Sequence, residues 1–237
     1  TVSWTVIHAA YLINLASPDR ALRRRSIETM IQELDRAAAV GVDALVTHVG
    51  HAMGAPPAAA VKRTAASLAQ VLDHASFRRQ PPMNLLLENT AGAGSALGGS
   101  FAELGELLDR LNAPPQVGIC LDTCHAVASG VDLRSPAAVA QAVAAMEDNV
   151  GPGRLRLIHL NDSVFPVGSR RDRHAHIGQG VMGDEGVAAV LSHPVLRALP
   201  VILETPKTFD DGSEADPVNL AKVRALYASA TRPSRGA

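Results

Sequence analysis

Short apolar runs alternate with longer amphipathic segments along the whole chain. In the longer segments apolar residues recur every three to four positions, as in Ile27, Met30 and Leu34, and this spacing is typical of helices that bury one face. Strict alternation of strand and helix predicts a parallel sheet covered by helices. The apolar runs predict strands over 2–7, 43–48, 83–88, 116–122, 154–160 and 199–204, and the segments between them predict helices over about 20–40, 58–76, 100–111, 136–149 and 216–229, with a short helix after Asp184.

Local signals mark the ends of several of these helices. Gly41 follows the first helix at a position where a left-handed backbone is favoured. Ser100 and Glu103 have the spacing of a capping box, and Ser135 precedes a proline at the first helical position. The segment 161–183 is predicted as a long polar loop.

Each predicted strand ends in a side chain that can bind a metal ion. These residues are spaced about 40 positions apart, and they are His8, His48, Glu88, Asp122, His159 and Glu204. Polar residues at the carboxyl ends of successive parallel strands indicate the catalytic face of a (β/α)₈ barrel, also called a TIM barrel. An open, doubly wound sheet is the alternative, and it would gather ligands at one switch point.

Six strand–helix units are two fewer than a complete barrel contains. Because the chain begins inside an apolar run, we expect the first two units of the parent fold to be the missing ones. We therefore expect an α/β fold, a TIM barrel with about six of its eight units. A single domain would span 1–230, and 231–237 would be a disordered tail.

Composition narrows the class of protein without deciding it. The chain has 237 residues, of which 47% are hydrophobic, enough for a large core. Its net charge of −1 gives no general signal for nucleic acid or membrane, and no apolar run approaches the ~20 residues of a membrane span. With only Cys120 and Cys124, which we interpret as packing residues, a disulfide framework is excluded and a cytoplasmic location is expected.

Convergence of the polar strand ends favours a metal site. Several carboxylates in one small site would raise one another's pKa unless cations neutralised them. Imidazoles and carboxylates together are the ligand set of zinc or manganese. Asp172 and His174, two apart on an extended segment, project to the same side and could complete a further site with His125. Clustered divalent metals suit phosphoester hydrolysis.

Longer motifs surround these candidate ligands. They are His8 with Tyr11-Leu12-Ile13-Asn14-Leu15, Leu87-Glu88-Asn89-Thr90-Ala91-Gly92, Gly118-Ile119-Cys120-Leu121-Asp122-Thr123-Cys124-His125, His159-Leu160-Asn161-Asp162-Ser163, 169–174, Ile177-Gly178-Gln179-Gly180 and Ile202-Leu203-Glu204-Thr205. These motifs resemble those of endonuclease IV, the zinc-dependent apurinic/apyrimidinic (AP) endonuclease family of base-excision repair, whose fold is a xylose isomerase-like TIM barrel. The resemblance covers nearly the whole chain.

The resemblance implies three zinc ions per chain, with Mn²⁺ as an alternative at one site. Glu88 would bridge the first two ions, and Glu88 and Glu204 would be the ligands on which catalysis depends. The implied ligands are His8, His48 and Glu88 for the first ion, Glu88, Asp122, His159 and Glu204 for the second, and His125, Asp172 and His174 for the third.

The resemblance also implies an activity and a partner. Such an enzyme cuts duplex DNA on the 5′ side of an abasic site, through hydroxide activated by the metals, and leaves a 3′-hydroxyl and a 5′-deoxyribose phosphate. Tyr11 and Leu12 match residues that intrude into the duplex, which fits the use of apolar wedges against unstacked DNA. Arg170, Arg171 and Arg173 would contact phosphates. A monomer in the bacterial cytoplasm, associated with the nucleoid, is expected.

Two loops depart from the family's pattern, and two other functions stay open. The usual His-Pro-Gly-Ser is His48-Val49-Gly50-His51 here, and the usual Gly-Gln-Gly is Gly92-Ala93-Gly94. A metal-dependent sugar isomerase or epimerase on a related barrel is the first alternative, since it also draws His, Asp and Glu from strand ends. A catalytically weak protein that binds DNA lesions is the second.

Overall fold

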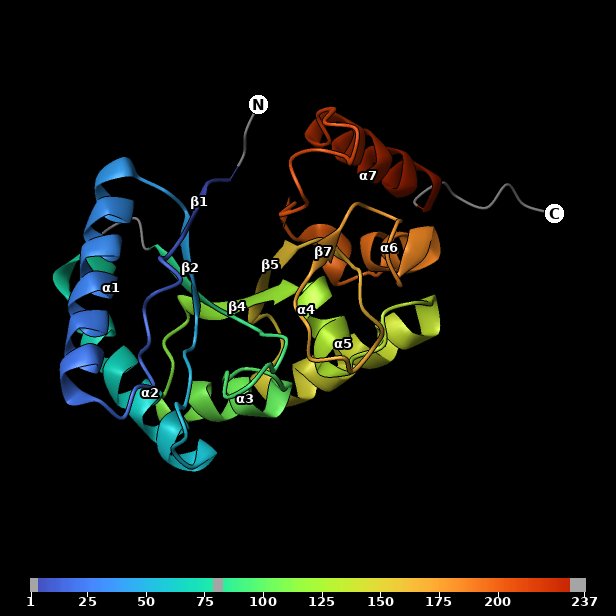
Figure 1. Ribbon diagram of the computed structural model, residues 1–237. Helices are drawn as coiled ribbons and strands as arrows, with labels where there is room; N and C mark the ends of the chain where they lie inside the picture. The colour runs from blue at the N-terminus through green and yellow to red at the C-terminus, as the bar shows by residue number, and fades with distance from the viewer. Residues whose placement is uncertain (1–3, 79–82, 231–237) are drawn as a thin grey trace. The chain divides into compact units, whose positions relative to one another are not determined.

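A computed structural model describes residues 4–78 and 83–230, which form an α/β fold (Figure 1). The predicted tail 231–237 and the first residues of the predicted strand 2–7 lie outside the described residues. The chain divides into two compact units. Unit 1 comprises Thr1–Leu121 and Met146–Arg156, and unit 2 comprises Asp122–Ala145 and Leu157–Ala237.

Unit 1 is built on parallel strands that follow one another in chain order. The strands are β1 (Val6–His8), β2 (Ala44–His48), β3 (Asn84–Glu88) and β4 (Val117–Asp122, whose last residue belongs to unit 2). The register pairs His48 with Glu88, and Glu88 with Cys120. Beyond β4, the Ile119 amide donates to the Arg154 carbonyl at 2.8 Å, where the chain enters β5 (Leu155–His159).

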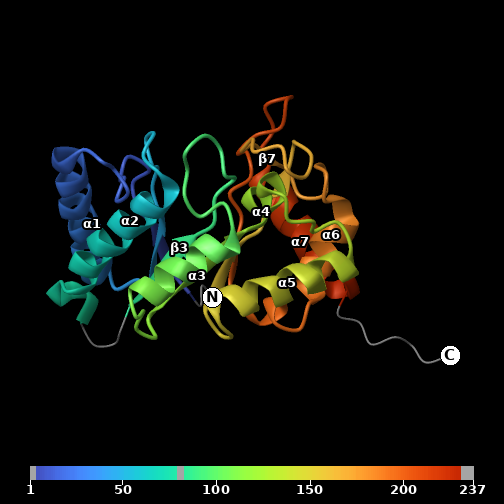
Figure 2. The same cartoon turned by 90° about the horizontal axis from the view of Figure 1, so that it is seen from below.

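Two helix ends of unit 1 lie where the sequence signals predict. Gly41 adopts φ 81° after the first helix, and Ser100 accepts from the Glu103 amide at the start of the third. The Glu103 carboxylate accepts from the Gly98 amide rather than completing the capping box on Ser100. Figure 2 shows the three α-helices side by side. The helices are α1 (Arg20–Val40), α2 (Pro57–Leu72), the 3₁₀ helix η1 (Ala75–Arg78) and α3 (Phe101–Arg110).

Unit 2 contains the later strands and a small hairpin. The end of β5 pairs in parallel with β8 (Val201–Ile202), through Ile158 with Val201 and His159 with Ile202. β6 (Asp162–Ser163) and β7 (His174–Ala175) pair antiparallel. Its helices are α4 (Thr123–Ser129), α5 (Pro136–Val150, whose last turn belongs to unit 1), α6 (Gly183–Ser192), η2 (Leu196–Ala198) and α7 (Asp216–Ala230).

Several predicted boundaries are wrong. The helix predicted to 76 ends at Leu72, and a 3₁₀ turn follows. The strand predicted over 199–204 is short because the Glu204 amide donates to the Asn161 side chain at 2.8 Å instead of extending the ladder. Helix α4 and the hairpin were not predicted, because short capped elements inside polar segments carry little periodicity.

The core is aliphatic, as the composition predicts. Leu45, Leu86 and Ile119, on the strands of unit 1, are fully buried, and both cysteines are buried. Within the described ranges, no helix has the length and apolar character needed to cross a membrane.

Candidate metal centre

Three candidate ligands converge at the strand ends of unit 1. β1, β2 and β3 end at His8, His48 and Glu88, and one ligand atom of each lies within 4.8 Å of the others. The distances to the same Glu88 oxygen, Oε2, are 2.8 Å from His8 Nε2 and 3.5 Å from His48 Nδ1. Because the register pairs His48 directly with Glu88, hydrogen bonds of the sheet set their separation.

The His8 ring has an acceptor at each nitrogen. Its Nδ1 lies 2.8 Å from the Ala9 carbonyl oxygen, and its Nε2 faces the buried Glu88 carboxylate. A neutral imidazole carries one N–H and cannot donate to both. Donation from Nδ1 to a backbone carbonyl, with Nε2 directed at a metal, is the usual arrangement of a zinc-binding histidine.

A second group in unit 2 contains Asp122, His159 and Glu204, whose ligand atoms also lie within 4.8 Å of one another. β4 and β5 end at the buried Asp122 and His159, and Glu204 lies just beyond β8. His159 Nδ1 is 3.2 Å from Glu204 Oε2. The group therefore combines two carboxylates with one imidazole, a donor set that suits zinc.

Asn161 holds two members of this group, a role that the sequence did not assign to it. This buried side chain donates from Nδ2 to Asp122 Oδ2 at 2.6 Å and accepts from the Glu204 amide at Oδ1. The Thr123 hydroxyl accepts from the Asn161 amide and donates to its carbonyl. The only signal in the sequence is the position of Asn161 in a shared motif, two residues after His159.

A third group, here called the loop-borne group, consists of His125, Asp172 and His174. Asp172 lies 3.1 Å from His125 Nε2 and 3.4 Å from His174 Nε2. His125 lies on α4 rather than on a strand, because Asp122 caps that helix by accepting from the His125 amide at 2.7 Å. Asp122 is thus both a helix cap and a candidate ligand.

Charge coupling in the loop-borne group shifts two pKa values. The hydrogen bond from His125 and the nearby His174 imidazole hold the pKa of Asp172 well below its usual range. Burial opposes protonation of His174, but hydrogen bonds and charge from Asp172, Asp122 and the Glu204 carbonyl outweigh it and raise the pKa of His174 to about 9. The protonated His174 imidazole and the ionised Asp172 carboxylate therefore stabilise one another.

The surroundings of the two His174 ring nitrogens indicate whether a metal ion suits the loop-borne group. Its Nδ1 lies 3.0 Å from the Glu204 carbonyl oxygen, whereas its buried Nε2 has no hydrogen-bond partner among the residues that the structure describes. Carboxylate oxygens of Asp172 and Asp122 lie 3.4 and 3.7 Å from that nitrogen. An unsatisfied imidazole nitrogen between carboxylates fits a divalent cation with nitrogen and oxygen ligands.

Cys124 lies beside these ligands but differs from them chemically. Its Sγ is within 4.8 Å of ligand atoms of Asp122 and His174. Burial, with the nearby Asp122 charge, raises the pKa of the Cys124 thiol to about 12. Because a metal binds the thiolate rather than the thiol, this environment favours a packing role.

Tyr11 and Leu12 form an exposed tip on unit 1, with 84% and 74% of their surface accessible. Asn14, whose role was also missed in the sequence, holds this tip. Its Oδ1 accepts from the His51 amide at 2.9 Å, and its Nδ2 donates to the His51 carbonyl at 3.1 Å. Gly50 adopts φ 106° in the same turn, and a Cβ there would lie 2.7 Å from Asn14 Oδ1.

The three candidate phosphate contacts lie on the loop before β7. Arg170, Arg171 and Arg173 are all exposed, and Arg170 has a left-handed backbone with φ 55°. The Arg171 guanidinium stacks 3.6 Å from the centroid of the Phe165 ring. A stacked guanidinium keeps its charge and loses mobility, which suits a surface that binds anions.

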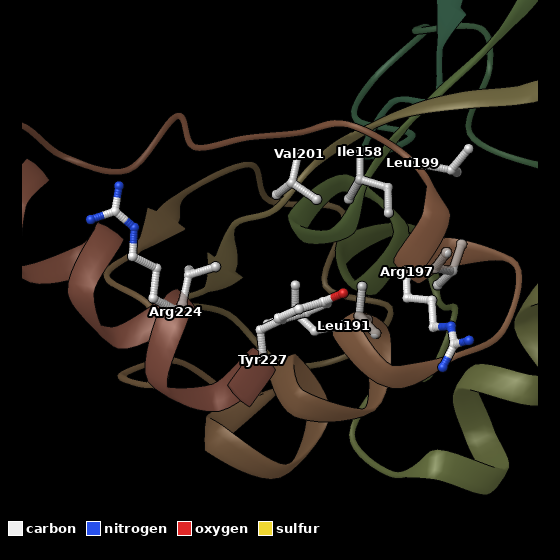
Figure 3. Close-up of a pocket in the computed structure, with 10 residues that line it drawn as sticks. Ile158, Leu191, Arg197, Leu199, Val201, Arg224 and Tyr227 are labelled. Atoms are coloured by element: carbon white, nitrogen blue, oxygen red, sulfur yellow. The ribbon is translucent and has the colours of Figure 1, made fainter. Parts of the chain in front are cut away.

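A cavity of about 260 Å³ in unit 2 has no predicted ligand in its lining. Figure 3 shows Tyr227 across its middle, with Arg197 and Arg224 on opposite sides. The remaining walls are aliphatic, from residues such as Ile158, Leu191 and Val201. The described residues that line this cavity include no carboxylate, imidazole or thiol, so it is not a candidate catalytic site.

A family model described as xylose isomerase-like TIM barrel matches residues 2–222. A D-tagatose 3-epimerase-like protein has a related structure, with a TM-score of 0.72 over 94% of this chain and 78% of that one, at 19% identity. Identity this low shows a shared fold alone. The chain therefore belongs to the xylose isomerase-like TIM barrel family.

Closer relatives define its place in that family. A protein of Nitratidesulfovibrio vulgaris named probable endonuclease 4 is 41% identical over 94% of this chain and 77% of its own length. The crystal structure of endonuclease IV from Thermus thermophilus superposes with a TM-score of 0.79 at 36% identity, over 94% of this chain and 76% of that one. Within the barrel family, the chain is a member of the endonuclease IV group.

Proposed function

We propose that this chain is a zinc-dependent endonuclease that hydrolyses the phosphodiester on the 5′ side of abasic sites in duplex DNA. The products would be a 3′-hydroxyl and a 5′-deoxyribose phosphate. The observation that supports it is the grouping of all nine implied ligands into three sets of close ligand atoms, one in unit 1 and two in unit 2. Membership of the endonuclease IV group supports the substrate class.

Each group would hold one zinc ion. When bound, the ions would lower the pKa of water and neutralise developing charge on the phosphate. His8 and His174 would direct Nε2 at an ion while Nδ1 donates to a backbone carbonyl. Glu88 and Glu204 would supply the charge that compensates the cations.

Surface residues would supply recognition of the lesion. Tyr11 and Leu12 would insert at the abasic nucleotide, where little stacking has to be broken, and Asn14 would keep that tip rigid. Arg170, Arg171 and Arg173 would contact phosphates on the strand being cut. The chain would act as a monomer, since all proposed ligands come from one copy.

A nicking assay tests the proposal. A duplex oligonucleotide labelled at one 5′ end and carrying a single tetrahydrofuran abasic analogue is incubated with the purified chain, before and after treatment with a strong chelator. We expect one labelled product that a DNA polymerase extends, loss of nicking after chelation, and recovery with added zinc. The same duplex with an intact nucleotide is the substrate control.

Other outcomes separate the alternatives. Binding of the abasic duplex without any nicking would identify a lesion-binding protein and overturn the proposed reaction. Metal-dependent conversion of a ketose to its epimer, without nicking, would identify an epimerase. Nicking that resists chelation and zinc depletion would overturn the metal assignment.

A further inference from the structure

Asp162 is a buried carboxylate that the proposed chemistry does not use. It follows β5 at the start of β6 and has none of its surface exposed. No lysine, arginine or histidine pairs with it among the described residues. A carboxylate buried without a cation needs several hydrogen bonds to offset its lost hydration.

Four backbone amides supply those hydrogen bonds. Oδ1 accepts from the amides of Ser163 at 2.7 Å and Met182 at 2.9 Å. Oδ2 accepts from the amides of Gly180 at 2.9 Å and Gly183 at 3.2 Å. Three of the four donors lie 18 to 21 residues further along the chain. The Asp162 side chain therefore joins the two ends of a long loop, residues 163–180, here called the excursion.

The excursion that Asp162 closes carries two members of the loop-borne group. The chain leaves at Ser163, runs outward, and returns at β7, where His174 pairs with Ser163. The outer part is held separately on α4, since the amides of Gly168 and Arg170 donate to the carbonyls of Val127 and Ala128. Asp172 and His174 lie between these two attachments along the chain.

Gly180 shows how closely the returning chain approaches the carboxylate. A Cβ at this position would lie 2.5 Å from Asp162 Oδ1 and 2.7 Å from its Cγ. Real side chains do not tolerate such contacts, so the close approach requires glycine here. The Asp162 carboxylate therefore packs tightly against the turn at Gly180, and this contact is here called the joint.

We infer that Asp162 is a positioning residue that holds Asp172 and His174 in place for the third metal ion. The inference rests on the proposed function only for the presence of that ion. It goes beyond the ligand set, because Asp162 touches neither ligand and acts through the backbone that carries them.

The isosteric variant Asp162→Asn provides the test. An amide oxygen can accept from two amides, but the amide nitrogen would place its own N–H groups against those of Gly180 and Gly183. We expect the base of the excursion to open. Zinc affinity at the loop-borne group should then fall ~10–100-fold, the range found when groups that orient metal ligands are removed.

Zinc per chain is measured after equilibration against a graded series of competing chelators, with nicking recorded separately. We expect Asp162→Asn to lose one of three ions at chelator strengths where the parent keeps all three. Hydrogen exchange should quicken in 163–175 but not in the strands of unit 1. Gly180→Ala, which leaves the charge unchanged, should produce the same loss. Asp211→Asn, an exposed carboxylate that accepts from Ser213, is the matched control.

Two results would overturn the inference. Retention of all three ions with parental affinity in Asp162→Asn would show that the joint does not position the ligands. Parallel loss of every ion in both variants would show a role in general stability instead. Because zinc is counted directly, a parent that binds three ions but fails to nick abasic DNA would overturn the proposed reaction and leave this inference standing.

Discussion

The ligand group of unit 1 and the loop-borne group of unit 2 are built in different ways. His8, His48 and Glu88 each end a strand, and the sheet register sets the spacing of His48 and Glu88. His125, by contrast, lies on a helix. His174 lies on a two-residue strand, and Asp172 lies in the loop just before that strand. Sheet hydrogen bonds therefore preorganise the first group, whereas the second depends on side chains such as Asp122 and Asp162 that bond to the backbone.

The largest expected effect on incision comes from removing a ligand from the group of unit 1. Glu88→Ala removes a fully buried carboxylate that faces two imidazoles. Incision of the abasic duplex should fall by more than ~100-fold, because even residues that only orient metal ligands contribute 10–100-fold. Glu204→Ala should have a similar effect. The control is Glu106→Ala, a half-buried glutamate on α3 that pairs with Arg110. Wild-type incision by Glu88→Ala would refute the assignment of this group.

A smaller loss of incision is expected when a ligand of the loop-borne group is removed. His174→Ala should remove one zinc ion per chain and leave the ions of the strand-end groups bound, because those groups do not use the excursion. Incision should fall less than in Glu88→Ala. Zinc analysis after dialysis measures the count. His74→Ala, at a surface histidine paired with Asp35, is the control. Loss of all zinc from His174→Ala would mean that the groups are not independent.

Truncating the exposed tip should weaken recognition of the abasic duplex without changing the zinc content. Tyr11→Ala should raise the KM for the abasic duplex about tenfold, since stacking on a base contributes ~1–3 kcal/mol, and zinc content should stay unchanged. The matched control is Tyr227→Ala, because the chain has two tyrosines and Tyr227 lines the apolar cavity of unit 2. An unchanged KM in Tyr11→Ala would argue that the tip packs beside the DNA without entering it.

The smallest effect is expected at Cys124. With its thiol pKa raised to about 12 by burial, only ~1 in 10⁴ molecules carries the thiolate at pH 8. The native protein should therefore resist iodoacetamide, and mass spectrometry should find Cys124 modified only after denaturation. Rapid alkylation of the native protein would show that unit 2 opens readily around the loop-borne group.

The strand ends could be predicted because they depend on local chemistry. A run of β-branched and aliphatic residues stops where a polar side chain begins. The strands β2, β3 and β4 end at the predicted residues, and β1 and β5 end within one residue of them. Helix ends at Gly41 and Ser100 were predictable for the same reason. Glu204 was placed on a strand that ends earlier, because the competing hydrogen bond from its amide to Asn161 joins residues 43 positions apart.

The sequence by itself determined the parallel α/β pattern, the residue types at the strand ends and the membership of the endonuclease IV group. These follow from periodicity and from motifs, which are properties of neighbouring residues. Only the tertiary structure decided that Asn161 joins Asp122 to Glu204, that Asn14 clamps the exposed tip, and that Asp162 closes the excursion. Such hydrogen bonds connect residues distant in the chain, and an Asn or Asp in a polar loop carries no periodic signal of its partner.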